Sequence, residues 1–226
     1  MNGIFIGDIV IHRIPNTPIT KKFISSHTLL SKDKKYFNYD KINGIEIEDE
    51  ISNGCDEEYI HWESRILLGE YMTSQIYVQE QVISEFTLAL LKDFRYYDVN
   101  YYTGGLMKFG KNTKCNFFNT DCNKLLIEGT TENTQRYSTF PNEFCSSITK
   151  STCTSGRLSR GICENSLLSN DMLGSKYSRN SWENYGNKYA DYCPISLSEK
   201  EDKTHNKISF LYILIIPFNF FLFRNT

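Results

Sequence analysis

Apolar residues recur at helical spacing in two stretches of this chain. The clearer stretch is residues 79–93, in which Val82, Phe86 and Leu90 fall on one face. A weaker pattern over residues 20–36 places apolar side chains on one side and lysines on the other. We therefore expect two amphipathic helices in the first half of the chain.

Strand-like sequence precedes the first of these helices. Ile4 to Ile14 alternates loosely, is rich in isoleucine and ends before Pro15, which predicts a short strand. The chain after the second helix is loop-rich, so we expect it to be mostly irregular with short strands. Together these elements predict an α+β fold.

A histidine, a large aromatic residue and a methionine lie in the stretch between the two predicted helices. They are His61, Trp62 and Met72. This region resembles the third-zinc-ligand and Met-turn region of leishmanolysin-like zinc metallopeptidases, which are surface metzincins. The residues that carry the resemblance are His61-Trp62-Glu63, Arg65, Gly69-Glu70, Met72, Phe86, Leu88 to Leu91 and Asp93.

The resemblance implies a role for two of these residues. His61 is then a zinc ligand, and Met72 closes a turn that forms a hydrophobic floor beneath the metal without binding it. Zinc takes neutral imidazole nitrogens in a near-tetrahedral set and activates a bound water. The implied cofactor is Zn²⁺ and the implied substrates are peptides or proteins. Judged on the residues alone, His61 could equally be a buried core histidine and Met72 an ordinary core methionine.

The chain lacks the rest of such a catalytic centre. No H-E-x-x-H occurs, and the other histidines, His12, His27 and His205, are not spaced for joint binding. We assign them structural or solvated roles, and we assign no catalytic residue. The isolated chain should bind Zn²⁺ weakly and should not hydrolyse peptides. Two functions are open: the C-terminal part of a cell-surface zinc metalloendopeptidase, or a non-catalytic membrane-tethered surface or adhesion module derived from that scaffold.

Two residues depart from the family's usual pattern. Tyr39 stands where the family usually has a cysteine, which removes one expected disulfide partner. Arg95 stands where a glycine usually ends the second helix. The resemblance covers roughly residues 17–194 despite these departures.

Cysteine placement bears on the compartment. The chain has seven cysteines, without a C-x-x-C pair, which argues against a zinc ribbon or a thioredoxin-like motif. All except Cys55 lie between Cys115 and Cys193, which suggests an extracytoplasmic region held by disulfides. Scattered buried thiols in a cytosolic protein are the alternative.

The two ends of the chain favour different compartments. No signal peptide is visible at the N-terminus. Ile208 to Phe223 is almost wholly apolar but shorter than the about 20 residues of a spanning helix. Small residues and a polar spacer precede it, as in a lipid-anchor signal. The tail is therefore an anchor signal that is removed, a short membrane span or a buried pair of strands, and the first two place the protein on the cell surface, facing outward.

These observations divide the chain into four parts. The resemblance implies that residues 1–112 are a partial metallopeptidase catalytic domain, with the third zinc ligand, the Met-turn and the following helix of the metzincin C-terminal subdomain. Residues 113–197 form a Cys-rich region, 198–207 a polar spacer and 208–226 a hydrophobic membrane tail or anchor signal. The net charge of −2 and the lack of a basic cluster argue against nucleic acid as a partner.

Overall fold

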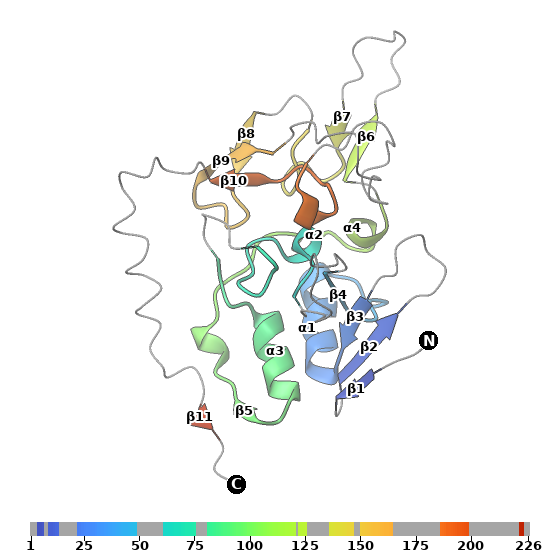
Figure 1. Cartoon of the computed structure of the whole chain (residues 1–226), viewed down its shortest axis with the longest axis vertical. Coiled ribbons are helices and arrows are strands. Elements are labelled where there is room, and N and C mark those ends of the chain that lie inside the picture. The colour runs from blue at the N-terminus through green and yellow to red at the C-terminus, as the bar shows by residue number, and fades with distance from the viewer. Residues whose placement is uncertain are drawn as a thin grey trace, which may run out of the picture.

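The computed structural model shows a mixed α+β fold (Figure 1). The two longest helices and the N-terminal sheet lie at one end, and the short strands of residues 123–198 lie at the other (Figure 1). The structure describes residues 4–6, 9–13, 22–48, 61–75, 81–120, 122–125, 136–146, 150–164, 186–198 and 222–223.

The N-terminal sheet is antiparallel, with strand order β1-β2-β3-β4. Its strands are β1 (Ile4–Ile6), β2 (Ile9–Arg13), β3 (Lys22–Ser25) and β4 (Ile45–Ile47). The short strand expected before Pro15 is confirmed, as a hairpin of two strands rather than one.

The first helix, α1 (His27–Phe37), starts later than expected. The prediction of helix from residue 20 is wrong, because β3 pairs with β2 on one side and with β4 on the other. Ser26 keeps an extended backbone, with φ −152° and ψ 164°, so the helix begins only after it. Pairing with two neighbouring strands has overridden a weak helical pattern in this segment.

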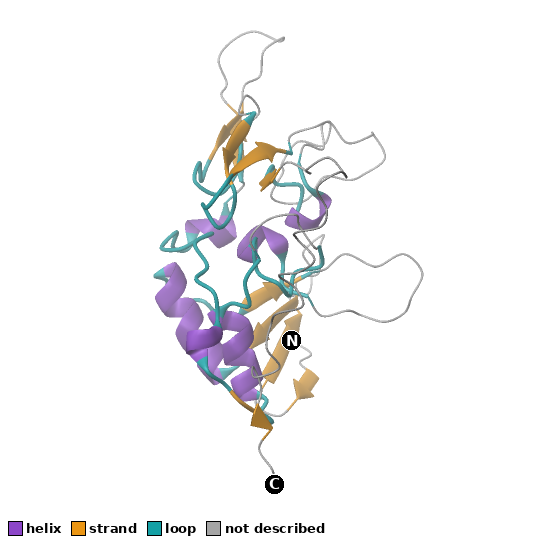
Figure 2. Cartoon of the chain, turned by 90° about the vertical axis from the view of Figure 1, so that its left-hand side faces the viewer, coloured by secondary structure: helices purple, strands orange, loops and turns teal. Residues whose placement is uncertain are grey.

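The second helix, α3 (Glu85–Asp93), is confirmed but is also shorter than expected. The Ser84 side chain accepts hydrogen bonds from the backbone N–H groups of Phe86 and Thr87, which sets the start of the helix. Residues 81–83 are not helical, and residues 76–80 lie outside the described residues. The helices α1 and α3 pack together on one side of the N-terminal sheet (Figure 2).

The N-terminus of α1 is capped by a residue of α3. Asp93 accepts hydrogen bonds from Ser26 Oγ at 2.5 Å, Thr28 N at 2.8 Å and Leu29 N at 3.2 Å. Partial burial would raise the pKa of Asp93, but these hydrogen bonds hold it below its ordinary value. A carboxylate is favoured here because the helix N-terminus presents unpaired N–H groups and a positive dipole end.

Removing this cap should loosen both helices. We expect Asp93→Ala to lower the free energy of unfolding by about 1–2 kcal/mol at neutral pH, the usual cost of a lost cap. The pKa of Asp93 is lower in the folded protein than in the unfolded chain. The cap therefore stabilises the fold fully at a pH above the ordinary pKa of about 3.9, and this stabilisation is lost as the pH falls through the folded pKa. Urea unfolding at pH 7 and in acid checks both points. The exposed Asp98→Ala is the control, and an equal effect of both variants would contradict the cap.

Arg95, just after α3, has a backbone conformation suited to glycine, with φ 63°. A left-handed conformation costs a non-glycine residue about 1–2 kcal/mol, while glycine gains about 0.5–1 kcal/mol of entropy on unfolding. We therefore expect Arg95→Gly to raise the free energy of unfolding by about 0.5–1 kcal/mol. Arg95→Ala removes the same side chain and keeps the strain, so chemical denaturation should show no such gain for it. Equal stability of the two variants would contradict this origin.

The remaining elements are short. They are α2 (Ser64–Leu67), β5 (Tyr97–Asp98), η1 (Tyr101–Thr103), α4 (Asn116–Asn119), β6 (Asn123–Leu125), β7 (Arg136–Ser138), β8 (Ser151–Cys153), β9 (Arg160–Cys163), η2 (Lys188–Ala190), β10 (Ser196–Ser198) and β11 (Leu222–Phe223). Three of the strands form a sheet in the order β10-β9-β8, while β6 pairs with β7 and β11 with β5.

Aromatic side chains join the two ends of the molecule in one core. Phe37 of α1 stacks on Phe86 of α3 and on Phe117 of α4, with ring centroids 6.0 and 6.2 Å apart. Phe117 in turn stacks on Phe144 at 5.8 Å. The backbone N–H of Lys114 also donates to the carbonyl of Phe37. The Cys-rich region therefore packs directly against α1, which in turn packs against α3, within the described residues.

Two disulfides staple the Cys-rich region. They join Cys122 to Cys193 and Cys145 to Cys163. The expectation of a disulfide-bonded region is confirmed for these four cysteines. The other two cysteines of this region, Cys115, which is half-buried, and Cys153, which is exposed, are free thiols. Cys55 lies outside the described residues.

The apolar tail falls almost entirely outside the described residues. Only Leu222 and Phe223 are described, as β11, where they pair with Asp98 and Tyr97. Within the described part of the chain, no helix combines the length and apolar character that crossing a membrane needs. The anchor signal and the short span stay predictions.

Candidate functional site

His61 and Met72 lie on two segments that hydrogen-bond to each other. The N–H of Trp62, the next residue after His61, donates to the carbonyl of Met72 at 2.9 Å. Trp62 also forms a parallel bridge with Thr73. The carbonyl of His61 accepts from the N–H of Glu48, just after β4, at 2.9 Å. The backbone at His61 is thus held between the end of β4 and the turn that contains Met72.

The two side chains differ in their surroundings. His61 is half-buried, whereas Met72 is 43% exposed. Met72 is therefore not part of the core that the described residues form. Its assignment as the Met-turn residue, and that of His61 as a zinc ligand, stay predictions. His27 is exposed at the start of α1, and His205 lies outside the described residues.

Glu70, two residues before Met72, is fully buried and accepts four hydrogen bonds. Its donors are the N–H of Met72, the N–H and hydroxyl of Ser84, and the hydroxyl of Thr87. Burial raises the pKa of Glu70, and these hydrogen bonds oppose the shift. The Thr87 hydroxyl also accepts from the indole Nε1 of Trp62 at 2.8 Å. A single buried network therefore joins the Met72 turn, the start of α3 and Trp62.

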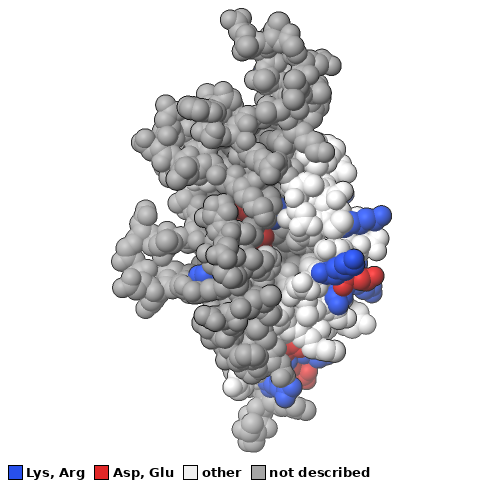
Figure 3. Space-filling model, turned by 90° about the vertical axis from the view of Figure 1, so that its right-hand side faces the viewer, with Lys and Arg blue, Asp and Glu red and all other residues white. Residues whose placement is uncertain are grey.

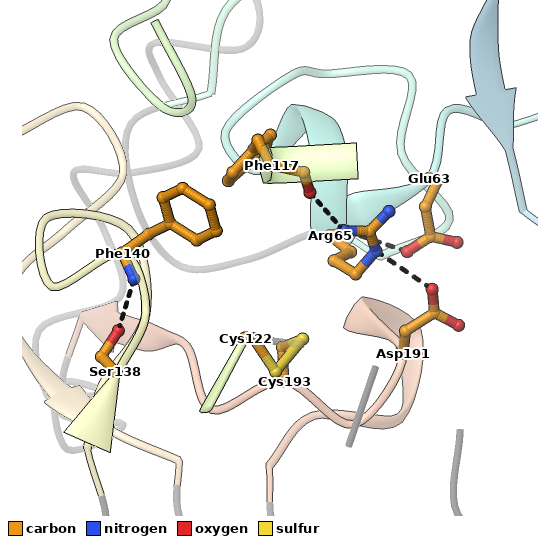
Figure 4. Close-up of a disulfide and its surroundings, with 8 residues drawn as sticks. All are labelled: Glu63, Arg65, Phe117, Cys122, Ser138, Phe140, Asp191 and Cys193. Atoms are coloured by element: carbon orange, nitrogen blue, oxygen red, sulfur yellow. Dashed lines mark hydrogen bonds and ion pairs between the residues drawn. A yellow bond between two sulfur atoms is a disulfide. The ribbon is translucent and has the colours of Figure 1, made fainter. Parts of the chain in front are cut away.

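A second buried network is centred on Arg65 of α2 (Figure 4). Its guanidinium donates to Asp191 Oδ2 at 3.2 Å, to Glu46 Oε2 at 3.3 Å and to the carbonyl of Phe117 at 2.9 Å. These partners come from β4, from α4 and from the residue after η2. Arg65 thus connects the His61 segment to the Cys-rich region.

Glu63 lies beside the Arg65 network (Figure 4). Its carboxylate caps α2 by accepting from the N–H of Arg65 at 2.8 Å. Burial raises the pKa of Glu63 well above its usual range, and the charges of Asp191 and Glu48 add to this shift. Trp62 and Glu63, which carry the sequence resemblance, are therefore buried structural residues that directly follow His61 in the chain.

The sequence did not reveal what Glu70 and Arg65 do. Both were singled out through the resemblance, but their hydrogen-bond partners could not be recognised. Asp191 is 126 positions from Arg65, and its sequence context carries no signal of a shared ion pair. Only Ser84, a residue type favoured at the start of a helix and followed here by an apolar run, could have suggested part of the Glu70 network.

The described residues do not by themselves assemble a zinc site. They contain no group of three or more His, Cys, Asp or Glu side chains that could hold a metal ion. An imidazole such as His61 fits as one ligand of Zn²⁺, but catalytic zinc needs three protein ligands. We therefore assign no step of peptide hydrolysis to the described part of this chain.

Comparison with known proteins identifies the family. The leishmanolysin peptidase family matches residues 8–208 of the chain. The chain belongs to the leishmanolysin family. It is 30% identical over 199 residues to a leishmanolysin-like peptidase of Caenorhabditis elegans, which covers 78% of this chain and 28% of that protein. It is 23% identical over 225 residues to leishmanolysin of Leishmania major, covering 97% of this chain and 35% of that protein.

The similarity is highest over a shorter part. A leishmanolysin-like peptidase of Drosophila melanogaster is 35% identical over 94 residues, which is 42% of this chain and 13% of that protein. The chain thus spans between 13% and 35% of the length of these three leishmanolysin relatives. The family to which the chain belongs is a family of peptidases.

Proposed function

We propose that this chain supplies one zinc ligand, His61, and the Met-turn, Met72, of a cell-surface zinc metallopeptidase. The observation that carries this proposal is the hydrogen bond from Trp62 N to Met72 O, which joins the two segments. Family membership supports peptides or proteins as the substrates. In the complete centre, the zinc would activate a water for attack on the peptide bond. The part of this chain in that chemistry is to hold one imidazole next to the Met72 turn.

The test uses the protein that carries this chain, isolated from the cells that make it. We expect His61→Ala to abolish peptide hydrolysis and to lower the zinc content, because one of three protein ligands is lost. His27→Ala, at an exposed histidine, is the matched control and should leave both unchanged. Activity and zinc content that survive His61→Ala would refute the ligand role.

The isolated chain should behave differently. Made by itself, it should bind Zn²⁺ weakly and should not cleave a generic peptide, since the described residues offer no group of three or more metal ligands. Zinc titration followed by calorimetry, together with a fluorogenic peptide assay, checks this. Tight stoichiometric zinc or measurable hydrolysis would contradict the prediction.

A non-catalytic surface or adhesion module is the second candidate. It is favoured by the lack of a three-residue metal-ligand group among the described residues. In that case the protein isolated from cells would contain no zinc, and His61→Ala would change neither its zinc content nor its lack of peptidase activity. Phospholipase release from the cell surface would support a lipid anchor for either function, whereas recovery of the intact chain from the cytosol would oppose both.

On the face in Figure 3, lysine and arginine side chains lie next to aspartate and glutamate side chains. The described residues of that face therefore do not form a continuous basic surface. We propose peptides or proteins, and not nucleic acid, as the partners.

A further inference from the structure

Glu70 is a buried carboxylate surrounded by hydrogen-bond donors. One oxygen, Oε2, accepts from the N–H of Met72. The other, Oε1, accepts from Ser84 N and Ser84 Oγ, each at 3.0 Å, and from Thr87 Oγ1 at 2.5 Å. The side chain is 0% exposed, so a carboxylate that lost these partners would have no water to replace them.

We propose that Glu70 is a positioning residue that holds the Met72 turn and the Trp62 segment together, and so sets where His61 stands relative to Met72. This inference rests on the proposed role of His61 as a zinc ligand. It assigns Glu70 no contact with the metal or the substrate. Its action is to fix the backbone and the indole beside the ligand.

The directions of the hydrogen bonds require an acceptor at position 70. The Trp62 indole N–H can only donate, so Thr87 Oγ1 accepts from it and its own hydrogen points elsewhere. That hydrogen goes to Glu70. Ser84 Oγ likewise accepts from Phe86 N at the helix start and donates to Glu70. Both hydroxyls are therefore oriented by the same carboxylate.

Backbone hydrogen bonds hold the Met72 turn where the side chain of Met72 adds little packing. The turn is not part of a helix or strand, and the Met72 side chain is 43% exposed. Both polar groups of the Met72 backbone are nevertheless used: the N–H by Glu70 and the carbonyl by Trp62 N. The Tyr71 N–H adds one backbone bond to the carbonyl of Val82 at 2.8 Å. Because the N–H and the carbonyl of Met72 are both hydrogen-bonded, the turn also holds the backbone of Trp62 and the adjacent peptide of His61 in place.

Two substitutions distinguish the contact of Glu70 with Met72 from its contacts with Ser84 and Thr87. In Glu70→Gln the carbonyl oxygen can still accept from Ser84 and Thr87, but the NH₂ group then faces the N–H of Met72, donor against donor. Thr87→Val removes the hydroxyl that links the Trp62 indole to Glu70 and leaves Met72 N untouched. The two variants therefore loosen different ends of the same network.

The experiment measures hydrogen exchange by NMR on the whole chain. In Glu70→Gln we expect the amides of Met72 and Trp62 to exchange about tenfold faster or more relative to amides of α1. The ring resonances of His61 should shift as well, without added metal. In Thr87→Val the indole N–H of Trp62 should exchange faster while the amide of Met72 changes little. The milder Thr87→Val keeps the test decisive if Glu70→Gln does not fold.

Glu143→Gln is the matched control. Glu143 is also buried, at 8% exposure, but pairs with Arg157 at 3.1 Å instead of the Met72 turn. It should leave the His61 ring and the amides of residues 62 and 72 unchanged. If Glu70→Gln accelerates exchange uniformly across the chain, or shifts the His61 ring no more than Glu143→Gln does, the positioning role is overturned.

A separate measurement tests the proposed function. His61→Ala in the protein that carries this chain should lower its zinc content. If it does not, the zinc-ligand role of His61 fails, whatever Glu70→Gln does to exchange. The exchange data decide independently whether Glu70 holds the two segments together.

Discussion

Replacing Arg65 by methionine should lower the free energy of unfolding by about 3–5 kcal/mol, as breaking a buried ion pair by removing one partner does. Arg65 is 1% exposed and donates to Glu46, Asp191 and the carbonyl of Phe117. Methionine has a similar apolar stem but no charge. The variant would therefore remove the positive charge that pairs with the buried Glu46 and the partly buried Asp191, and the donor of the Phe117 carbonyl. Chemical denaturation of the wild type and the variant measures the difference.

Arg157→Met is the control for this prediction. Arg157 also pairs with a buried glutamate, Glu143, at 3.1 Å, but its own side chain is 40% exposed. An exposed partner contributes about 0–1 kcal/mol, so this variant should be close to the wild type. Adding Glu46→Gln and Asp191→Asn to Arg65→Met should recover part of the loss, because the uncompensated charges are then removed. Similar stabilities of the two arginine variants would contradict a central role for Arg65.

The second large effect is expected from the disulfide between Cys122 and Cys193. The two residues are 71 positions apart, so the bridge closes a long loop. On the chain-entropy account, removing the disulfide raises the entropy of the unfolded chain and so lowers the free energy of unfolding by about 4 kcal/mol. Cys193 lies two residues after Asp191, so the bridge also holds the segment that meets Arg65 (Figure 4). Thermal unfolding of the double variant Cys122→Ser/Cys193→Ser should show this loss.

The other disulfide provides an internal comparison. Cys145 and Cys163 are 18 positions apart, and the same account gives about 3 kcal/mol for that loop. Cys145→Ser/Cys163→Ser should therefore be destabilised less than the Cys122/Cys193 pair. Cys153→Ser, at an exposed free thiol, should have little effect. A reversed order of the two disulfide variants would show that strain or residual structure, and not loop length, controls their contributions.

Sequence reasoning was most successful where the signal is local. The periodic apolar residues around Phe86 predicted α3, and the alternation before Pro15 predicted strand, because side-chain periodicity depends only on neighbouring residues. The clustering of cysteines predicted a disulfide-bonded region. The stretch from His61 to Met72 indicated the family, since its residue types occur together at the family's spacing.

The features that the sequence left open all depend on residues far apart in the chain. Segment 22–25 is a strand because β2 and β4 flank it, although its own pattern suited a helix. Which cysteines pair could not be read from their spacing. Ser84 was not recognised as the start of α3, since apolar residues continue the helical period before it. Tertiary pairing and capping thus decided where both helices begin.

The site shows the same division. Sequence similarity singled out His61, Glu70 and Met72. It did not reveal that the Met72 side chain is exposed or that the Glu70 carboxylate accepts a hydrogen bond from the backbone of Met72. Arg65 depends on partners at 46, 117 and 191, which are brought together only by the packing of α2 against β4, α4 and η2. A buried charge is stable only where the fold supplies its counter-charges and acceptors. The local sequence therefore identifies the candidate residues of this site, whereas their burial and their hydrogen-bond partners are determined by long-range packing.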